Sequence, residues 1–157
     1  MRGRWYHWAL PISAALAYGV LVLWFGPMVD AGGLPSFDLR PLGYSPDEVR
    51  AFLRALTAEG MAAYLGPVRI TDTVFPVLFT VTLCLPLRGW VPTLPALGYG
   101  GFDLAENLMV ARLLRAGPDG PEGAMRLASG LTVVKFAALV LAVILAARAL
   151  WRAWPRR

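Results

Sequence analysis

Four apolar stretches dominate the chain and limit the folds that are open to it. They lie at approximately residues 9–28, 70–87, 92–112 and 128–147, and each approaches the roughly 20 residues that a helix needs to cross about 30 Å of hydrocarbon. Of the 157 residues, 57% are hydrophobic, a larger share than an ordinary soluble domain has. The sequence therefore predicts an all-α integral membrane protein with four transmembrane helices, forming a single membrane domain over residues 1–157.

The first stretch has some features of a secretory signal. Arg2 and Arg4 precede it, and Val29, Asp30 and Ala31 follow it at the position of a cleavage site. A signal peptide has an apolar core of about 7 to 15 residues. Because this stretch is longer, we interpret it as the first membrane span.

The arginines near the span ends bear on the orientation. If both termini are cytoplasmic, the inner segments carry seven arginines and no acid, and the outer segments also carry seven arginines. The first span decides this tie, because Arg2 and Arg4 lie beside its inner end whereas Arg40 is the first basic residue beyond its outer end. Trp151 and Trp154 add interfacial anchors beside the basic C-terminal tail. We expect a bacterial cytoplasmic (inner) membrane protein with both termini in the cytoplasm.

The segment between the first two spans, residues 30–69, contains a detailed helix signal. Ser45 can act as the N-cap, Pro46 fits the first helical position, and Glu48 completes a capping box. Apolar residues then recur at helical spacing, at Val49, Phe52, Leu53 and Leu56. We predict one amphipathic helix over residues 45–60, ended by Gly60 and then by Gly66 and Pro67, that lies on the membrane surface or roofs the bundle.

Composition excludes several kinds of site. Cys84 is the only cysteine and His7 the only histidine, so one copy of the chain cannot form a disulfide, a zinc site of the usual ligands or a bis-histidine haem site. We expect no cofactor and no metal, with a carboxylate-rich metal site as the open alternative. The pI is near 10.0, yet the arginines are scattered over span ends and form no basic stripe, so nucleic acid is not an expected partner.

Charged residues occur inside two of the apolar stretches. Lys135, the only lysine, lies within LTVVKFAALVLAVILAA, and Asp103, Glu106 and Asn107 lie within the third stretch. An ionisable group at the centre of a bilayer costs about 2.5 to 3.5 kcal/mol, and such groups usually pair with one another or mark a functional path. The spacing i, i+3 and i+4 places the three polar residues of the third stretch on one helix face.

Helical rise predicts that these charges lie at a common depth. We take the third span to start at the inner boundary near Pro92 and the fourth to start at the outer boundary near Ala128. At 1.5 Å per residue, Asp103 lies about 16 Å and Glu106 about 21 Å from the inner boundary. Lys135 lies about 10 Å from the outer boundary, which is about 20 Å from the inner one in a core of about 30 Å. The short connection over residues 116–125 favours antiparallel neighbours. We therefore expect Lys135 to contact Glu106 or Asp103.

Other polar residues extend this cluster toward the outer face. Ser129 and Thr132 precede Lys135 by one to two turns, and Asp72 enters the second span near the same face. Arg40 could reach Asp72 or the polar stripe formed by Asp103, Glu106 and Asn107. Asp72 could equally be a favourable first-turn acid, or it or Thr71 could cap the second span. Pro76 lies inside the second span, where a kink would free backbone carbonyls.

Glycines precede the polar residues of the third stretch. They are Gly98, Gly100 and Gly101, and glycine in a membrane helix lets a neighbouring backbone approach closely.

Three functions fit this pattern. The first is a non-catalytic accessory or assembly subunit, or a homo-oligomer, in which the charged cluster holds the helices together. The second is a membrane enzyme or binding protein for a lipid or amphiphile, with Asp103, Glu106 and Lys135 as candidate catalytic groups. The third is proton or cation translocation. The expected partners are the lipid bilayer, a membrane protein or second copy, and a lipid or amphiphilic ligand; the chain contains no motif by which we recognise a known family.

Overall fold

The computed structural model describes the chain from Tyr6 to Ala153, and its side chains from Ala9 onward. Its helices are α1 (Tyr6–Gly19), α2 (Pro46–Ala55), α3 (Ala58–Ala63), α4 (Arg69–Cys84), α5 (Trp90–Ala116) and α6 (Glu122–Ala153). Within this part of the chain, β-type pairing is limited to one isolated bridge between Ala31 and Leu34. The terminal residues used above for orientation, Arg2, Arg4, Trp154, Arg156 and Arg157, lie outside the described residues, as does the side chain of His7.

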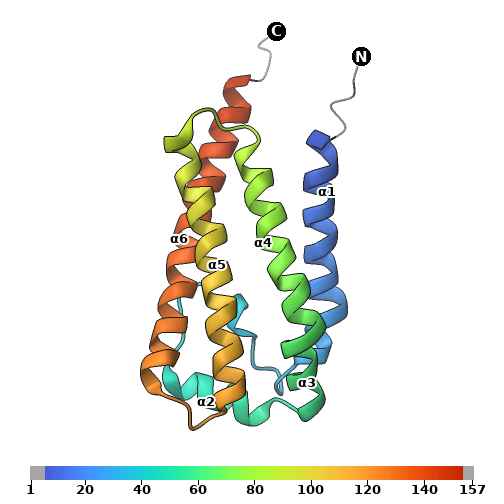
Figure 1. Cartoon of the computed structure of the whole chain (residues 1–157), viewed down its shortest axis with the longest axis vertical. Coiled ribbons are helices and arrows are strands. Elements are labelled where there is room, and N and C mark those ends of the chain that lie inside the picture. The colour runs from blue at the N-terminus through green and yellow to red at the C-terminus, as the bar shows by residue number, and fades with distance from the viewer. Residues whose placement is uncertain (1–5, 154–157) are drawn as a thin grey trace.

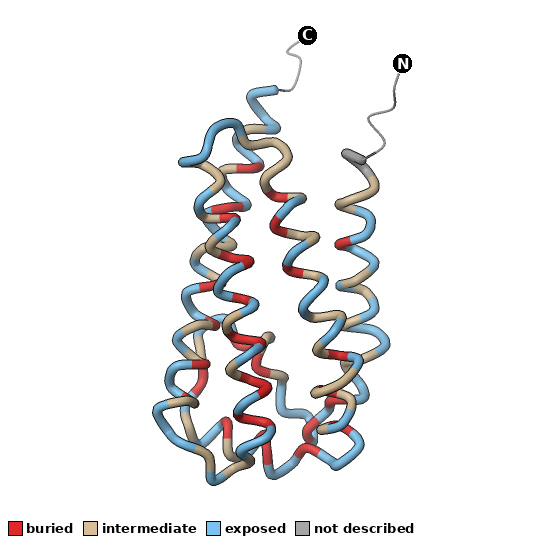
Figure 2. Tube along the Cα trace, in the orientation of Figure 1, coloured by how far each residue is buried: buried red, intermediate tan, exposed pale blue. Residues whose placement is uncertain are grey.

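Four long helical segments run antiparallel to their neighbours in sequence. Figure 1 shows α4 between α1 and α5, with α5 packed along α6, and residues of α1 and α4, of α4 and α5, and of α5 and α6 are in contact. The N-terminal end of α1 and the C-terminal end of α6 lie at the same end of the bundle, and the short helices α2 and α3 lie at the other end. Buried residues face the inside of the bundle (Figure 2), while large apolar side chains such as Leu16, Leu23 and Ile70 are exposed on the outside.

Within the described residues, three helical segments are long and apolar enough to cross a membrane: Ala9–Val29, Ala58–Cys84 and Glu122–Ala153. The outward apolar side chains and these lengths support association with a membrane. The 27 residues of α5 are also long enough, but Asp103, Glu106 and Asn107 make this helix less apolar. Length and composition therefore identify three spans where the sequence predicts four.

The helices extend beyond the predicted spans at several ends. The first continues through a π-helical turn, Val20–Phe25, and a 3-10 turn, Gly26–Val29. The third and fourth cover residues 90–116 and 122–153 instead of 92–112 and 128–147, whereas α4 ends at Cys84, short of residue 87. Hydropathy registers only the apolar part of a helix, whereas backbone hydrogen bonding continues into its polar ends.

The predicted capping box begins α2, but the predicted helix over 45–60 is two helices. The Ser45 N–H donates to Glu48 at 2.7 Å and the Glu48 N–H donates to the Ser45 hydroxyl at 3.3 Å. The pKa of Glu48 is lowered because its carboxylate accepts the Ser45 N–H and also the Ser45 hydroxyl, the latter at 2.8 Å. The helix ends at Ala55, and Leu56, its C-cap, has an extended backbone. The Thr57 side chain then accepts a hydrogen bond from Gly60 and caps a new helix, α3.

The glycines predicted to end this helix lie within helical turns instead. Gly60 is inside α3, where a Cβ would lie 3.0 Å from the carbonyl oxygen of Met28. Gly66 has non-helical backbone angles within the π-helical turn Tyr64–Val68, so it and Pro67 kink the path from α3 into α4 without ending it. The close approach of the Met28 backbone explains why glycine is needed at position 60.

The segment that joins α1 to α2 re-enters the space between the helices (Figure 1). Its 3-10 turn, Phe37–Leu39, contacts α6, and the Tyr44 N–H donates to the Ser129 hydroxyl of α6 at 2.8 Å. Gly43 has a φ of +86°, and a Cβ there would lie 2.7 Å from the Ser129 oxygen. We call residues 30–45 the re-entrant loop.

The apolar face of α2 covers one end of the bundle. Its predicted apolar residues are buried, and they join a core with the re-entrant loop and the ends of α5 and α6 that includes Val49, Phe52, Phe37, Leu113 and Met125. Of the two placements expected for the amphipathic helix, the structure thus shows the one in which it roofs the bundle.

Gly100 marks the closest approach of α4 and α5. A Cβ at this position would collide with the side chain of Thr80 on α4, whereas a Cβ at Gly98 would make ordinary contacts and one at Gly101 would meet nothing. Of the three glycines noted in the sequence, Gly100 is therefore the one that the packing requires.

We expect Gly100→Ala to lower the thermal stability of the purified protein and Gly101→Ala to leave it nearly unchanged. Alanine at position 100 must push α4 away or displace Thr80, and overpacking typically costs about 1 to 3 kcal/mol. Both changes raise helix propensity equally, so Gly101→Ala is the matched control. Equal midpoints for the two variants in a thermal unfolding assay in detergent would contradict this packing argument.

Candidate functional site

The ammonium of Lys135 contacts three carboxylates from two parts of the chain. Its Nζ lies 2.8 Å from Asp38 of the re-entrant loop, 3.0 Å from Asp103 of α5, and in contact with Glu106 of α5. Lys135, Asp103 and Glu106 are buried, and Asp38 is partly exposed. We call these four residues the Lys135 cluster. The contact that helical rise predicts between Lys135 and the acids of α5 is present, with one acid added.

Thr132 supports the cluster from the turn before Lys135. Its hydroxyl donates to Glu106 and also lies 3.1 Å from the Ala128 carbonyl of its own helix. Thr132 is fully buried. A carboxylate deep in a protein needs such donors, because an unsatisfied buried charge is far more costly than a paired one.

Asn107 connects the cluster to α4 through a backbone atom. Its side-chain amide donates to the Asp72 carbonyl at 2.8 Å and to the Asp103 carboxylate at 3.2 Å. The Asp72 carbonyl would normally accept from the residue four positions later, but that residue is Pro76, which has no N–H. Asn107 therefore satisfies a carbonyl that the proline frees, and it orients Asp103 at the same time.

Asp72 and Arg40 have different surroundings from those proposed above. The half-buried side chain of Asp72 lies in the first turn of α4 and has no hydrogen-bond or ion-pair partner among residues 9–153. It does not cap the helix, because α4 continues directly from the π-helical turn. Asp72 contributes its backbone carbonyl to the site.

Arg40 does not reach Asp72 or the acids of α5. Its guanidinium donates to the Pro35 carbonyl at 3.0 and 2.6 Å and lies 3.8 Å from Glu48. It also lies 5.8 to 5.9 Å from the ring centres of three aromatic residues, Phe37, Tyr44 and Phe52. Arg40 is buried, and it stabilises the re-entrant loop against α2 through cation–π contacts and hydrogen bonds.

Ser129 and Tyr44 attach the re-entrant loop beside the cluster. Ser129, proposed as part of the polar side of α6, accepts the Tyr44 N–H. Burial raises the pKa of the Tyr44 hydroxyl, so this group stays protonated and neutral at physiological pH.

Sequence reasoning missed Asp38. It is one of two acids in a loop rich in glycine and proline, and no local pattern distinguishes it from the other, Asp30. Its role follows from the re-entry of the loop, which brings residues 97 positions apart in sequence into contact.

The charge balance of the cluster is its main chemical property. Oxygen atoms of Asp38, Asp103 and Glu106 all lie within 4.8 Å of one another, a spacing that can hold a metal ion. The Lys135 ammonium contacts all three, so it occupies the place that such an ion would take. Three carboxylates share one fixed positive charge, and like charges this close favour the uptake of a proton or cation.

Comparison of the chain with protein-family models, with curated proteins and with solved structures found no match.

We expect Lys135→Met and Glu106→Gln each to destabilise the protein, and the double variant to be more stable than the sum of the two losses predicts. Removing one partner of a buried pair costs about 3 to 5 kcal/mol when the other charge is left uncompensated. We expect that cost for Lys135→Met, which leaves three carboxylates without a cation, and a smaller cost for Glu106→Gln, because Asp38 and Asp103 still neutralise Lys135. The measurement is the thermal midpoint in detergent for each variant, analysed as a double-mutant cycle with a coupling of about 0.5 to 3 kcal/mol.

Arg126→Met is the control for this cycle. Arg126 forms an exposed pair with Glu122 on α6, and such pairs contribute about 0.3 to 0.5 kcal/mol. Additive losses for Lys135 and Glu106, or a loss at Arg126 as large as at Lys135, would contradict the central position of the cluster.

Proposed function

We propose that the chain crosses the membrane four times, in a bacterial inner membrane, with both termini cytoplasmic. The support for a fourth span is the position of α5, which packs along α6 and α4 and directs Asp103, Glu106 and Asn107 to partners within the protein. A helix with its polar groups satisfied internally can face lipid with its remaining sides. Arg2 and Arg4 support the orientation, because they lie beside one end of the first span and the first basic residue beyond its other end is Arg40.

We further propose that the protein is a non-catalytic component of the membrane, acting as an accessory or assembly subunit or as a homo-oligomer. The observation that carries this proposal is that Lys135 contacts carboxylates of α5 and of the re-entrant loop at once. The Lys135 ammonium thus donates to carboxylates of its own chain, as expected for an ion cluster whose role is to hold helices together.

The roof that the cluster holds offers a surface for a partner. The outward side of α2 is polar, with exposed Asp47, Glu48 and Arg54, while its inward side is anchored in the core. A rigid, charged surface held at the end of a small bundle is suited to specific contact with a second membrane protein or a second copy.

Proton or cation binding at the same cluster is the second candidate. Its support is the excess of two carboxylates over ammonium groups among Asp38, Asp103, Glu106 and Lys135. An enzymatic role in which Asp103 and Glu106 act on a lipid or amphiphile would use the same carboxylates.

Purification in a mild detergent followed by native mass measurement tests the non-catalytic proposal. The chain has a mass of 17.0 kDa, and we expect a discrete larger species that contains a second protein or several copies. Alanine substitution of Asp47 and Arg54 is expected to reduce that species without changing the thermal midpoint. A monomer at every detergent concentration, also after cross-linking in intact membranes, would overturn the proposal.

Labelling of single cysteines tests the fourth span. In a Cys84→Ser background, we expect Asp119→Cys in the turn after α5 to react with a membrane-impermeant maleimide in intact cells, and Arg88→Cys in the turn before α5 to react only after lysis. Both positions are exposed in the structure, so accessibility within the protein is matched. Equal reaction at the two positions in intact cells would show that α5 does not cross the membrane.

A further inference from the structure

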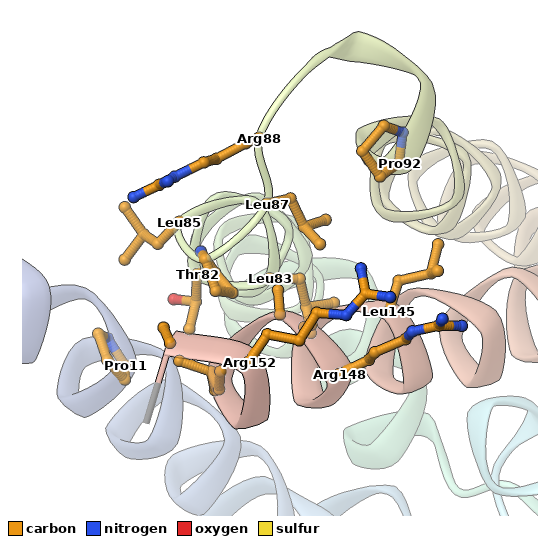
Figure 3. Close-up of a pocket in the computed structure, with 15 residues that line it drawn as sticks. Pro11, Thr82, Leu83, Leu85, Leu87, Arg88, Pro92, Leu145, Arg148 and Arg152 are labelled. Atoms are coloured by element: carbon orange, nitrogen blue, oxygen red, sulfur yellow. The ribbon is translucent and has the colours of Figure 1, made fainter. Parts of the chain in front are cut away.

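A groove of about 1580 Å³ lies at the end of the bundle that carries the two termini, opposite the re-entrant loop and α2 (Figure 3). Its walls come from α1 at Pro11, from the end of α4 and the turn that follows it, and from the last turns of α6. The Lys135 cluster does not line it. The groove is therefore a separate feature from the site described above.

The walls of the groove are largely apolar. Leucine, alanine and proline side chains make up most of the lining, including Leu83, Leu87, Leu145 and Ala146. Apolar walls in an open groove match the hydrocarbon part of a ligand, because burying apolar surface is favourable in proportion to its area.

Three arginines accompany these apolar walls: Arg88, Arg148 and Arg152. Arg148 and Arg152 are four residues apart on α6, and in Figure 3 they extend to the same side of that helix, while Arg88 comes from the turn across the groove. All three are exposed, and none has an ion-pair partner within residues 9–153. The lining contains no acid, so the positive charge of this end is not neutralised locally.

We propose that this groove binds an anionic phospholipid, with the phosphate of the headgroup at Arg88, Arg148 and Arg152 and an acyl chain along the leucine and alanine walls. Guanidinium groups bind phosphate oxygens through charge-assisted and often bidentate hydrogen bonds. Basic pockets between membrane helices on the cytoplasmic side are suited to anionic headgroups. The apolar walls select a lipid over a free phosphate ion, which would contact only the arginines.

The proposed orientation agrees with this ligand. The arginines lie at the end of the helices, where headgroups lie if these helices span the bilayer, and that end faces the anionic cytoplasmic leaflet if the termini are cytoplasmic. The inference rests on the proposed membrane arrangement. The cysteine-labelling experiment tests that arrangement separately, so failure of lipid binding and failure of the topology are distinguishable.

Native mass spectrometry of the detergent-purified full chain tests the proposal. Dioleoyl phosphatidylglycerol is titrated in parallel with dioleoyl phosphatidylcholine, and we expect saturable one-site binding only for the anionic lipid. The variant Arg148→Gln/Arg152→Gln should weaken that binding about 25-fold, at about five-fold for each arginine. The matched control is Arg112→Gln/Arg115→Gln at the opposite end of α5, which should bind like the unchanged protein.

A second variant tests the apolar wall, and it keeps the proposal testable if the arginine variant fails to fold. Ala149→Trp places a bulky ring in the groove and leaves all three arginines in place, so it should also weaken phosphatidylglycerol binding. Each variant is required to elute as the unchanged protein does in size-exclusion chromatography. Inorganic phosphate at millimolar concentration should not displace the lipid.

Several results would overturn the proposal. They are equal binding of the two lipids, equal loss in the Arg112/Arg115 control, unchanged binding when Ala149 is replaced, or complete displacement by inorganic phosphate. The last result would show that the arginines alone bind an anion and that the groove contributes nothing.

Discussion

The burial of one ammonium group in the middle of α6 is the constraint on which the rest of the structure depends. Without carboxylates around it, the Lys135 side chain would carry a large desolvation penalty in a buried position. Asp103 and Glu106 meet this requirement from α5, and Asp38 meets it from the re-entrant loop. The same contacts that stabilise the charge therefore set the register of α5 against α6. They also hold the re-entrant loop between the helices, and with it Arg40, its three aromatic rings and the roof formed by α2.

A second interaction, between Asn107 of α5 and the Asp72 carbonyl, connects α4 to the Lys135 cluster. Pro76 removes a backbone donor, the Asp72 carbonyl is left without its helical partner, and Asn107 supplies the missing hydrogen bond from α5. Gly100 permits the two helices to come close enough at Thr80. In a medium without water, freed backbone groups must be satisfied by neighbouring helices. A proline in one helix and an asparagine in the next thus act together, and the polar stripe of α5 serves both neighbours.

The two ends of the bundle differ in charge and in shape. One end contains the re-entrant loop and the roof, and several of its acids are paired with basic residues, whereas Asp103 and Glu106 lie in the middle of α5. The other end contains arginines and an apolar groove, with no acid in the lining. This difference underlies the two proposals made above, contact with a protein partner at the first end and binding of an anionic lipid at the second. The Lys135 cluster contains more carboxylates than ammonium groups, and this excess is the reason for proposing proton or cation binding as the second candidate function.

The sequence by itself determined the helical class, the capping box of α2, the buried face of that helix and the contact of Lys135 with the acids of α5. Each of these depends on spacing within one helix or on the rise of two neighbouring helices, which local rules describe. Only the tertiary structure decided that Asp38 joins the cluster, that Arg40 lies among aromatic rings, that α2 and α3 are separate helices and that Asn107 serves the carbonyl freed by Pro76. These features depend on the path of the re-entrant loop and on the approach of α4 to α5. That path is set by the need to pair a buried charge with whichever carboxylate can reach it, and no periodicity in the sequence records it.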